Sequence, residues 1–402
     1  MKYQFQSASH IDDYLKAIAG SDEFIVKTDN KNGLLVINYL FTTPITFPDP
    51  AGLEGEAHRL AVLRRDCRGL KFDLETGDVV AKPYHKFFNV NQVAETQVGV
   101  IDWSRPHVIL EKLDGSMITP FWHKDGAFQW HTKMGPTDVA TPIHERLQHL
   151  PTYVRLCEAM KEDGCTPIFE WCSRVQRIVI DYPRDQFVLT AVRHNTTGHY
   201  MAYPALVELA QRFRVPLVLA LPGTVQNAQS FLDETAEIEN AEGFVVRFDD
   251  GHMCKIKGAW YCRIHNTKEI LVFEKNVWNL ILNDSVDDAM AFMDDRDKPL
   301  VEDFAAEFEK RVRRRANDLA DRVTQARQTV ENKKQFALEV APTYPKRERS
   351  LMFSIWDGGN PVDVVKEFLA KNVGTQRAVD EVRDFIDGLA WKDFYYPTEL
   401  DD

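Results

Sequence analysis

The amino-acid sequence predicts an α+β protein in two parts, with antiparallel sheets and a few helices in residues 1–275 and helices alone in residues 276–402. In the first part, short apolar runs rich in β-branched and aromatic residues are separated by turn residues, which is typical of antiparallel strands. In the second part, apolar residues recur every four positions, which is typical of amphipathic helices. A length of 402 residues suits two or three domains.

The expected elements follow in chain order. Helical spacing appears at residues 11–18 and 203–213, and residues 43–56 form a loop rich in Pro and Gly. The expected strands are 24–26, 34–39, 108–110, 117–123, 127–133, 166–171, 175–180, 187–192, 242–248 and 252–257. The expected C-terminal helices are one that starts near Leu300 and ends at Pro342 and Pro345, one at 362–373 and one at 378–391.

Composition narrows the class of protein. The formal net charge of −12 does not by itself indicate a nucleic-acid-binding protein. Basic residues nevertheless cluster twice, and each cluster is either a face that holds a phosphate substrate or a solvated helix surface. The clusters are Arg64, Arg65, Arg68 and Lys71, and Lys310, Arg311, Arg313, Arg314 and Arg315.

Apolar runs and cysteines bear on location. No uninterrupted apolar run approaches the roughly 18 residues of a membrane span, so we expect no membrane association. The six cysteines are scattered without a Cys-x-x-Cys pair, which favours a cytoplasmic protein with reduced thiols. Nothing in the sequence requires an oligomer, and we expect a monomer.

The stretch Leu110–Ser116 contains the candidate nucleophile. The apolar run Val108–Leu110 predicts a buried strand and Asp114-Gly115 predicts a turn, so Lys112 lies at the end of the strand. A lysine is ordinarily protonated at neutral pH. A pocket that removes water or brings other cations close lowers its pKa and makes it a nucleophile. The alternative is a surface lysine beside a turn.

Three further stretches combine charge with apolar surroundings. Residues 82–89 place two lysines and His85 beside a proline and three aromatic residues, which suits a site that holds phosphates and stacks a base. Glu170 lies inside an apolar strand, where a lone carboxylate either faces outward or has a function. Lys255 and Lys257 are two apart on an expected strand and share one face, either as a solvent-facing pair or around a polyphosphate.

These residues, in this order, resemble the phage-type RNA ligase 1 family of the covalent nucleotidyltransferase superfamily. The resemblance covers residues 35–265. It is carried by Cys67-Arg68-Gly69, Lys86-Phe87-Phe88-Asn89, Lys112-Leu113-Asp114-Gly115-Ser116, Phe169-Glu170, Glu242-Gly243-Phe244-Val245, and Lys255-Ile256-Lys257 followed by Trp260-Tyr261.

The resemblance implies an ATP-dependent RNA ligase whose adenylyltransferase (nucleotidyltransferase) domain is residues 1–275. In such an enzyme Lys112 attacks the α-phosphate of ATP and becomes lysine–AMP. The AMP passes to an RNA 5′-phosphate, and an RNA 3′-hydroxyl then displaces it. The resemblance also implies repair of broken RNA, often a nicked tRNA, in the cytoplasm of a phage host, with residues 276–402 helping to select the RNA.

Residue roles are also implied by the resemblance. The expected catalytic residues are Lys112, Glu170, Glu242, Lys255 and Lys257. The two lysines on the last strand, together with bound Mg²⁺, would lower the pKa of Lys112 and neutralise the triphosphate. The carboxylates expected around Mg²⁺, or around Mn²⁺ in its place, are Asp114, Glu170 and Glu242, although Glu170 would alternatively hold the ribose hydroxyls. The expected ATP-binding residues are Tyr39, Arg68, Lys86, Glu111, Lys112, Lys133, Glu170, Glu242, Val245, Lys255 and Lys257.

Two alternatives stay open. One is a DNA ligase or a GTP-using capping enzyme, both of which usually carry a β-barrel after the lysine pair, where this chain looks helical. The other is a nucleotide- or RNA-binding protein without ligase activity. Such a protein would have no need of Lys112, Glu242 and the lysine pair together.

Overall fold

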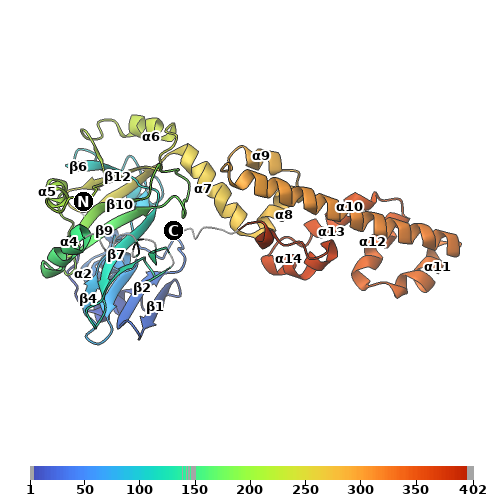
Figure 1. Ribbon diagram of the computed structural model, residues 1–402, viewed down its shortest axis with the longest axis horizontal. Helices are drawn as coiled ribbons and strands as arrows, with labels where there is room; N and C mark the ends of the chain where they lie inside the picture. The colour runs from blue at the N-terminus through green and yellow to red at the C-terminus, as the bar shows by residue number, and fades with distance from the viewer. Residues whose placement is uncertain (1–3, 138, 142, 144, 146–150, 396–402) are drawn as a thin grey trace. The chain divides into compact units, whose positions relative to one another are not determined.

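The computed structural model describes residues 4–137, 139–141, 143, 145 and 151–395, and it divides into two compact units, Met1–Cys262 and Arg263–Leu400 (Figure 1). The division falls inside helix α7 (Ala259–Val272), upstream of the expected boundary between residues 275 and 276. We describe each unit by itself.

The first unit begins with a four-stranded antiparallel sheet. Its strands, in spatial order, are β1 (Phe24–Asp29), β2 (Leu34–Tyr39), β3 (Leu70–Asp73) and β4 (Val79–Ala81). Helices α1 (Ile11–Ile18) and α2 (Gly55–Asp66) share a core with this sheet, in which Tyr14, Leu63 and Phe72 have no exposed surface. The apolar stripe of α1 was expected, whereas α2 was not.

A second antiparallel sheet lies in the middle of the unit. Its strands, in spatial order, are β10 (Gln186–His194), β9 (Cys165–Cys172), β7 (Ser116–Trp122) and β8 (Phe128–His131). Helices α4 (Pro151–Glu162) and α5 (Tyr203–Phe213) contribute to its core. The rings of Phe169 and Phe187 stack there with centroids 4.6 Å apart. The expected strand at 175–180 is wrong, because those residues are turns and bends whose buried amides bind a side chain instead of a neighbouring strand.

The third sheet positions the candidate nucleophile. Its strands, in spatial order, are β11 (Ala220–Leu221), β6 (His107–Glu111), β12 (Gly243–Phe248), β13 (Met253–Lys257) and β5 (Phe88–Asn89), and helix α6 (Ala228–Ala236) packs beside it. All neighbours are antiparallel except β13 and β5. In this register Glu111 pairs with Phe244 and Gly243 pairs with Lys257. The end of β6, the start of β12 and the end of β13 therefore lie side by side.

The second unit is helical in every regular element of its described residues, 263–395. After α7 come α8 (Glu274–Leu282), α9 (Val286–Met290), α10 (Asp297–Thr329), α11 (Lys333–Gln335), α12 (Lys346–Trp356), α13 (Pro361–Ala370) and α14 (Gln376–Val382). The apolar stripe expected on the long helix is confirmed, since Phe304, Phe308 and Val312 are fully buried in the core of this unit. No helix among the described residues is long and apolar enough to cross a membrane.

Two expected helix ends in this unit are wrong. Helix α10 stops at Thr329, well before the prolines, because Val330 is extended and the Asn332 side chain accepts a hydrogen bond from Gln335 N to cap the next turn. The helix expected at 378–391 stops at Val382. A 3₁₀ turn follows and ends at Asp387, whose φ of 55° breaks the helical path.

Candidate active site

Lys112 lies directly after β6 and is held from two sides. Its backbone N–H donates to the carbonyl oxygen of Gly243, 2.9 Å away, and its Nζ lies 2.7 Å from Glu242 Oε1. The same carboxylate oxygen is 3.1 Å from Lys257 Nζ. Glu242 is only 3% exposed. One buried carboxylate therefore bridges the candidate nucleophile and a lysine of β13.

Two glycines make this closeness possible. Gly243 has a φ of 134°, and a Cβ at this position would lie 2.0 Å from the carbonyl oxygen of Ile256 on β13. A Cβ on Gly115 would lie 2.4 Å from the carbonyl oxygen of Trp171 at the end of β9. Glycine at position 243 lets the start of β12 lie close to β13, and glycine at position 115 lets the turn after Lys112 lie close to the strand that carries Glu170.

The lysine pair on β13 has the expected geometry. Lys255 and Lys257 are half-buried on one face of the strand, while Ile256 is buried on the other. Val245 pairs directly with Lys255 across the ladder, so both side chains share that face. Burial lowers the pKa of Lys255 well below its usual value, and the charges of Lys112 and Lys257 lower it further. An anion between these groups would relieve their repulsion.

Glu170 faces the same charges from the second sheet. It lies on β9 opposite Met117 of β7. Burial raises its pKa to about 7, and the carboxylate of Glu242 adds to the shift, whereas Lys112 and Arg68 oppose it. The two sheets thus bring Glu170 and Glu242 to the same lysine.

The side chains of the protein alone raise the pKa of Lys112. Burial alone would lower this pKa, and the negative charges of Glu242 and Glu170 outweigh burial. Lys255 has the lowered pKa instead. In the protein alone, Lys112 is therefore the cationic partner of an ion pair with Glu242. The lowering of the Lys112 pKa by the lysines of β13 together with Mg²⁺ stays a prediction.

A second group of cations borders the site. The Tyr39 hydroxyl accepts a hydrogen bond from Lys86 Nζ at 3.4 Å, and this ammonium lies 4.7 Å from the centre of the Tyr39 ring. Burial would raise the pKa of Tyr39, but the charges of Arg68, Lys86 and Lys133 together lower it. Arg68 and Lys86 also lower the pKa of Lys255. The structure therefore brings these expected phosphate-binding residues into one electrostatic neighbourhood with the lysine pair.

The remaining expected residues lie close to Lys112 with different surroundings. Glu111 is the last residue of β6, and burial raises its pKa. Asp114, expected beside the metal, is 4% exposed, and its two oxygens accept hydrogen bonds from Val179 N, Ile180 N and the Tyr261 hydroxyl, each at 2.7 Å. These oxygens are occupied by protein donors, which favours an anchoring role over a metal-binding one.

Two aromatic residues that the sequence motifs include, but to which they assign no individual role, lie beside the lysine pair. Lys255 Nζ lies 5.5 Å from the centre of the Phe87 ring, and Lys257 Nζ lies 5.2 Å from that of Tyr261. Phe87 stands directly after Lys86, and Tyr261 stands four residues after Lys257. Their closeness in the sequence to lysine residues is the feature that could have indicated a cation–π contact.

The first basic cluster is not a surface patch. Arg65 is 2% exposed and its guanidinium lies 2.7 Å from Glu95. Lys71 is fully buried and donates to Gly69 O and Thr119 Oγ1. Burial removes water from this ammonium and lowers the pKa of Lys71 to about 7. Of this cluster, Arg68 is the residue that acts on the candidate site.

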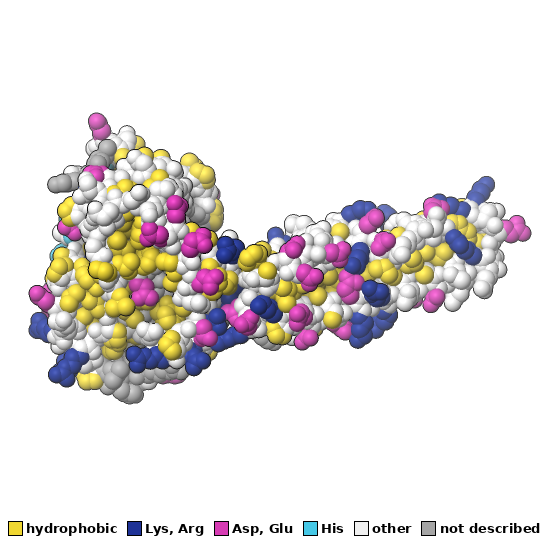
Figure 2. All heavy atoms as spheres, turned by 90° about the horizontal axis from the view of Figure 1, so that it is seen from above, with side chains coloured by type: hydrophobic (Ala, Val, Ile, Leu, Met, Phe, Trp, Pro, Cys, Tyr) yellow, Lys and Arg dark blue, Asp and Glu magenta, His cyan; other side chains and the backbone are white. Residues whose placement is uncertain are grey.

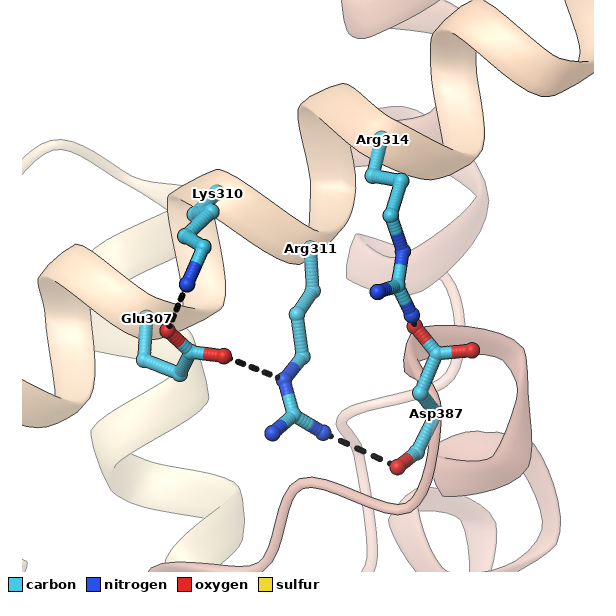
Figure 3. Close-up of a pocket in the computed structure, with 5 residues that line it drawn as sticks. All are labelled: Glu307, Lys310, Arg311, Arg314 and Asp387. Atoms are coloured by element: carbon cyan, nitrogen blue, oxygen red, sulfur yellow. Dashed lines mark hydrogen bonds and ion pairs between the residues drawn. The ribbon is translucent and has the colours of Figure 1, made fainter.

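The second basic cluster, on α10, is largely neutralised by acids of its own unit (Figure 3). Glu307 binds both Lys310 and Arg311, and Asp387 binds Arg314. Arg315 pairs with Glu348 at 2.5 Å. On the face that Figure 2 shows, Lys and Arg side chains of the helical unit alternate with Asp and Glu. This pattern favours a solvated, internally paired helix surface over a dedicated phosphate-binding face.

A divalent metal fits the site only in part. The described residues contain no cluster of three His, Cys, Asp or Glu side chains able to hold a metal. Glu170 and Glu242 are two carboxylates with an electrostatic influence on each other. Mg²⁺ is commonly held by one or two carboxylates together with substrate phosphates and waters. The donor set therefore fits a metal that arrives with a phosphate-bearing substrate.

The raised pKa of Glu170 predicts a pH-dependent stability. Its pKa is about 7 in the folded chain against 4.5 for an unperturbed glutamate. The folded protein therefore binds the Glu170 proton more tightly than the unfolded chain does. The resulting stabilisation is fully present below about pH 4.5 and is lost as the pH rises through 7. Glu170→Gln should leave the free energy of unfolding at pH 5 nearly unchanged and raise it by about 3 kcal/mol at pH 8. Thermal unfolding at both pH values measures this, with the exposed Glu158→Gln as control. Equal shifts at both pH values would contradict it.

Known proteins that are similar to this chain include RNA ligases. A family model described as RNA ligase matches residues 66–261. A putative RNA ligase of Thermovibrio ammonificans is 34% identical over 289 residues, which cover 69% of this chain and 70% of that protein. RNA ligase 1 of bacteriophage TS2126 is 24% identical over 267 residues, covering 64% of this chain and 63% of the phage protein. A solved archaeal ATP-dependent RNA ligase is 14% identical, with 64% of each chain covered and a TM-score of 0.44. The family match includes Lys112, Glu170, Glu242 and the lysine pair, and the chain belongs to the phage-type RNA ligase family.

Proposed function

We propose that this protein is an ATP-dependent RNA ligase that joins a 5′-phosphate end to a 3′-hydroxyl end through a lysine–AMP intermediate on Lys112. The observation that carries the proposal is the position of Lys112. It stands at the end of a strand, 2.7 Å from a buried glutamate that also binds Lys257, with Lys255 and Glu170 close enough to shift pKa values. A structural lysine would need one such partner and not this concentration of opposed charges.

In the first step Lys112 Nζ attacks the α-phosphate of ATP. A P–N bond forms, the bond from the α-phosphorus to the bridging oxygen breaks, and pyrophosphate leaves while Nζ loses its proton. Lys255 and Lys257, together with Arg68 and Lys86, whose charges act on Lys255, would supply positive charge for the phosphates. A divalent ion such as Mg²⁺, held by Glu170 and Glu242, would supply further charge at the leaving group. Val245 and Tyr39 would border the nucleotide.

The later steps use the same site. The AMP passes from Lys112 to an RNA 5′-phosphate, and an RNA 3′-hydroxyl then attacks that activated end and releases AMP. We infer that the substrate is a broken RNA, such as a nicked tRNA, and that a monomer in the cytoplasm does this work. The helical unit would then help to select the RNA.

The test is to incubate the protein with Mg²⁺ and α-³²P-labelled ATP or GTP, with and without a 5′-phosphorylated single-stranded RNA, and to resolve the products on a denaturing gel. Protein label from ATP alone, together with circular or joined RNA, supports the proposal. Label from GTP would indicate a capping-type enzyme. Absence of label with either nucleotide would indicate a binding protein.

The ion pairs on α10 predict a weak role for that basic run in RNA binding. Lys310→Ala and Arg314→Ala together should change RNA affinity by less than threefold at 0.15 M salt, because each side chain already has an acidic partner. Arg68→Ala should weaken the binding of RNA or ATP much more than this double variant does. Filter binding over a salt series measures this. A tenfold loss in the double variant, with a flatter salt dependence, would instead place RNA phosphates at α10.

A further inference from the structure

The turn that carries Lys112 is tied to two other segments through Asp114. Asp114 Oδ2 accepts hydrogen bonds from the backbone N–H groups of Val179 and Ile180, both at 2.7 Å, and Oδ1 accepts one from the Tyr261 hydroxyl, also at 2.7 Å. The Asp114 N–H donates to the hydroxyl of Tyr182 at 2.8 Å. We call these five residues the Asp114 clamp.

The clamp joins parts of the chain that no strand pairing holds together. Val179, Ile180 and Tyr182 belong to the connection between β9 and β10, whereas Tyr261 lies in the first turn of α7. Tyr261 is 2% exposed and Val179 is 1% exposed, so the groups that bind Asp114 are shielded from water. A buried amide or hydroxyl without a partner costs about 1–3 kcal/mol, and here one carboxylate satisfies three of them.

Tyr261 extends the clamp to the lysine pair. Its hydroxyl binds Asp114, two residues after the nucleophile, and its ring lies 5.2 Å from Lys257 Nζ. Lys257 in turn shares Glu242 with Lys112. A continuous series of contacts therefore runs from Asp114 through Tyr261, Lys257 and Glu242 to Lys112. The backbone between Lys112 and Asp114 closes the loop.

We propose that Asp114 and Tyr261 are positioning residues that fix Lys112 for attack on the nucleotide, and that Asp114 acts through the turn and not as a metal ligand. This inference rests on the proposed function. Both of the carboxylate oxygens that a metal would need are already bound by protein donors. The clamp therefore matters for the step in which Lys112 is the nucleophile and matters less for the last step, in which Lys112 forms no bond.

Two variants and two reactions test this proposal. Tyr261→Phe removes a single hydroxyl. Asp114→Asn replaces a pure acceptor by a group that must turn an N–H₂ toward one set of donors. The first reaction is single-turnover labelling of Lys112 by α-³²P-ATP over a series of Mg²⁺ concentrations. The second is joining of an RNA whose 5′ end is already adenylylated, which bypasses the labelling step.

We expect labelling to fall about tenfold in Tyr261→Phe and roughly a hundredfold in Asp114→Asn, at an unchanged Mg²⁺ midpoint. The double variant should be no slower than Asp114→Asn, because both changes break one unit. Joining of the adenylylated RNA should stay near the wild-type rate, which a misfolded protein would not show. Tyr153→Phe is the matched control, since its buried hydroxyl donates to Phe187 O at 3.0 Å outside the site.

The opposite results are equally clear. Recovery of Asp114→Asn at high Mg²⁺ would make Asp114 a metal ligand and overturn the proposal. Wild-type labelling in Tyr261→Phe, or equal losses in labelling and joining, would also overturn it. Failure of the proposed function is distinguishable, because the wild-type protein itself would then neither become labelled nor join RNA.

Discussion

Lys112→Ala is expected to abolish labelling of the protein by α-³²P-ATP, because no other lysine near the site can replace it. Lys255 and Lys257 are both paired in the ladder between β12 and β13, opposite Val245 and Gly243, so the strand fixes their positions. Lys112 instead stands directly after β6, before the turn in which Gly115 lies close to the backbone of β9. The measurement is the denaturing gel, followed by peptide mass spectrometry to locate AMP on residue 112.

The matched control is Lys124→Ala. Lys124 lies in the same unit and pairs with Glu75 at 2.9 Å on the exposed surface, so its loss should leave the label at the wild-type level. The Lys112→Ala protein should still join an RNA that carries AMP on its 5′ end, although it joins no 5′-phosphorylated RNA from ATP. A surviving label in Lys112→Ala would place the nucleophile elsewhere and remove the basis for the site.

The pattern of apolar residues predicted most of the helices and strands, because the period of buried residues differs between the two kinds of element. The strands around Asp249-Asp250-Gly251 and the stripe through Phe304, Phe308 and Val312 have strict periods, and the structure has the hairpin and the helix there. Helix α2 was missed because its sequence lacks a clear apolar stripe and carries arginines that are buried by partners distant in the chain. The segment 175–180 reads as a strand, but its amides bind Asp114 instead.

The order of the residues in the sequence predicted where the site lies, but it did not predict the direction of the pKa shifts within the site. Strand ends and pairing brought Lys112, Glu242 and Lys257 together, which spacing along the chain can suggest. The sign of a pKa shift depends on which carboxylate lies within about 3 Å in space, and no spacing rule supplies that distance. For the same reason the run at 310–315 resembled an RNA-binding patch, whereas Asp387 and Glu348, remote in the sequence, neutralise part of it.

Glu242→Gln is expected to have the second large effect: it should slow labelling by ATP and raise the intrinsic reactivity of Lys112. Glutamine keeps the shape of the side chain but removes the charge that Lys112 and Lys257 share. Labelling of the protein by ATP should fall about a hundredfold or more, because Glu242 no longer stabilises the charges of the two lysines or holds Lys112 in place. Removal of one partner from a buried ion pair also destabilises a protein by about 3–5 kcal/mol, and partial exposure of the two lysines reduces that cost here.

The intrinsic reactivity of Lys112 should nevertheless rise in this variant. Glu242 is the main cause that raises the pKa of Lys112 above its usual value, whereas burial acts to lower it. In the wild-type protein the neutral amine, and hence acylation of Lys112 by a small reagent, should increase about tenfold per pH unit up to a pKa above the normal range of lysine. In Glu242→Gln the same curve should level off at a lower pH.

Mass spectrometry of residue 112 after acylation over a pH series measures this directly, with the exposed Glu239→Gln as the control. A faster acylation by the reagent combined with a slower labelling by ATP would show that Glu242 holds the nucleophile in a protonated, correctly placed state until the nucleotide arrives. An unchanged acylation profile would mean that Glu242 does not set the charge of Lys112. The ion pair would then be a structural contact, and the release of Lys112 from it could not be a part of the reaction.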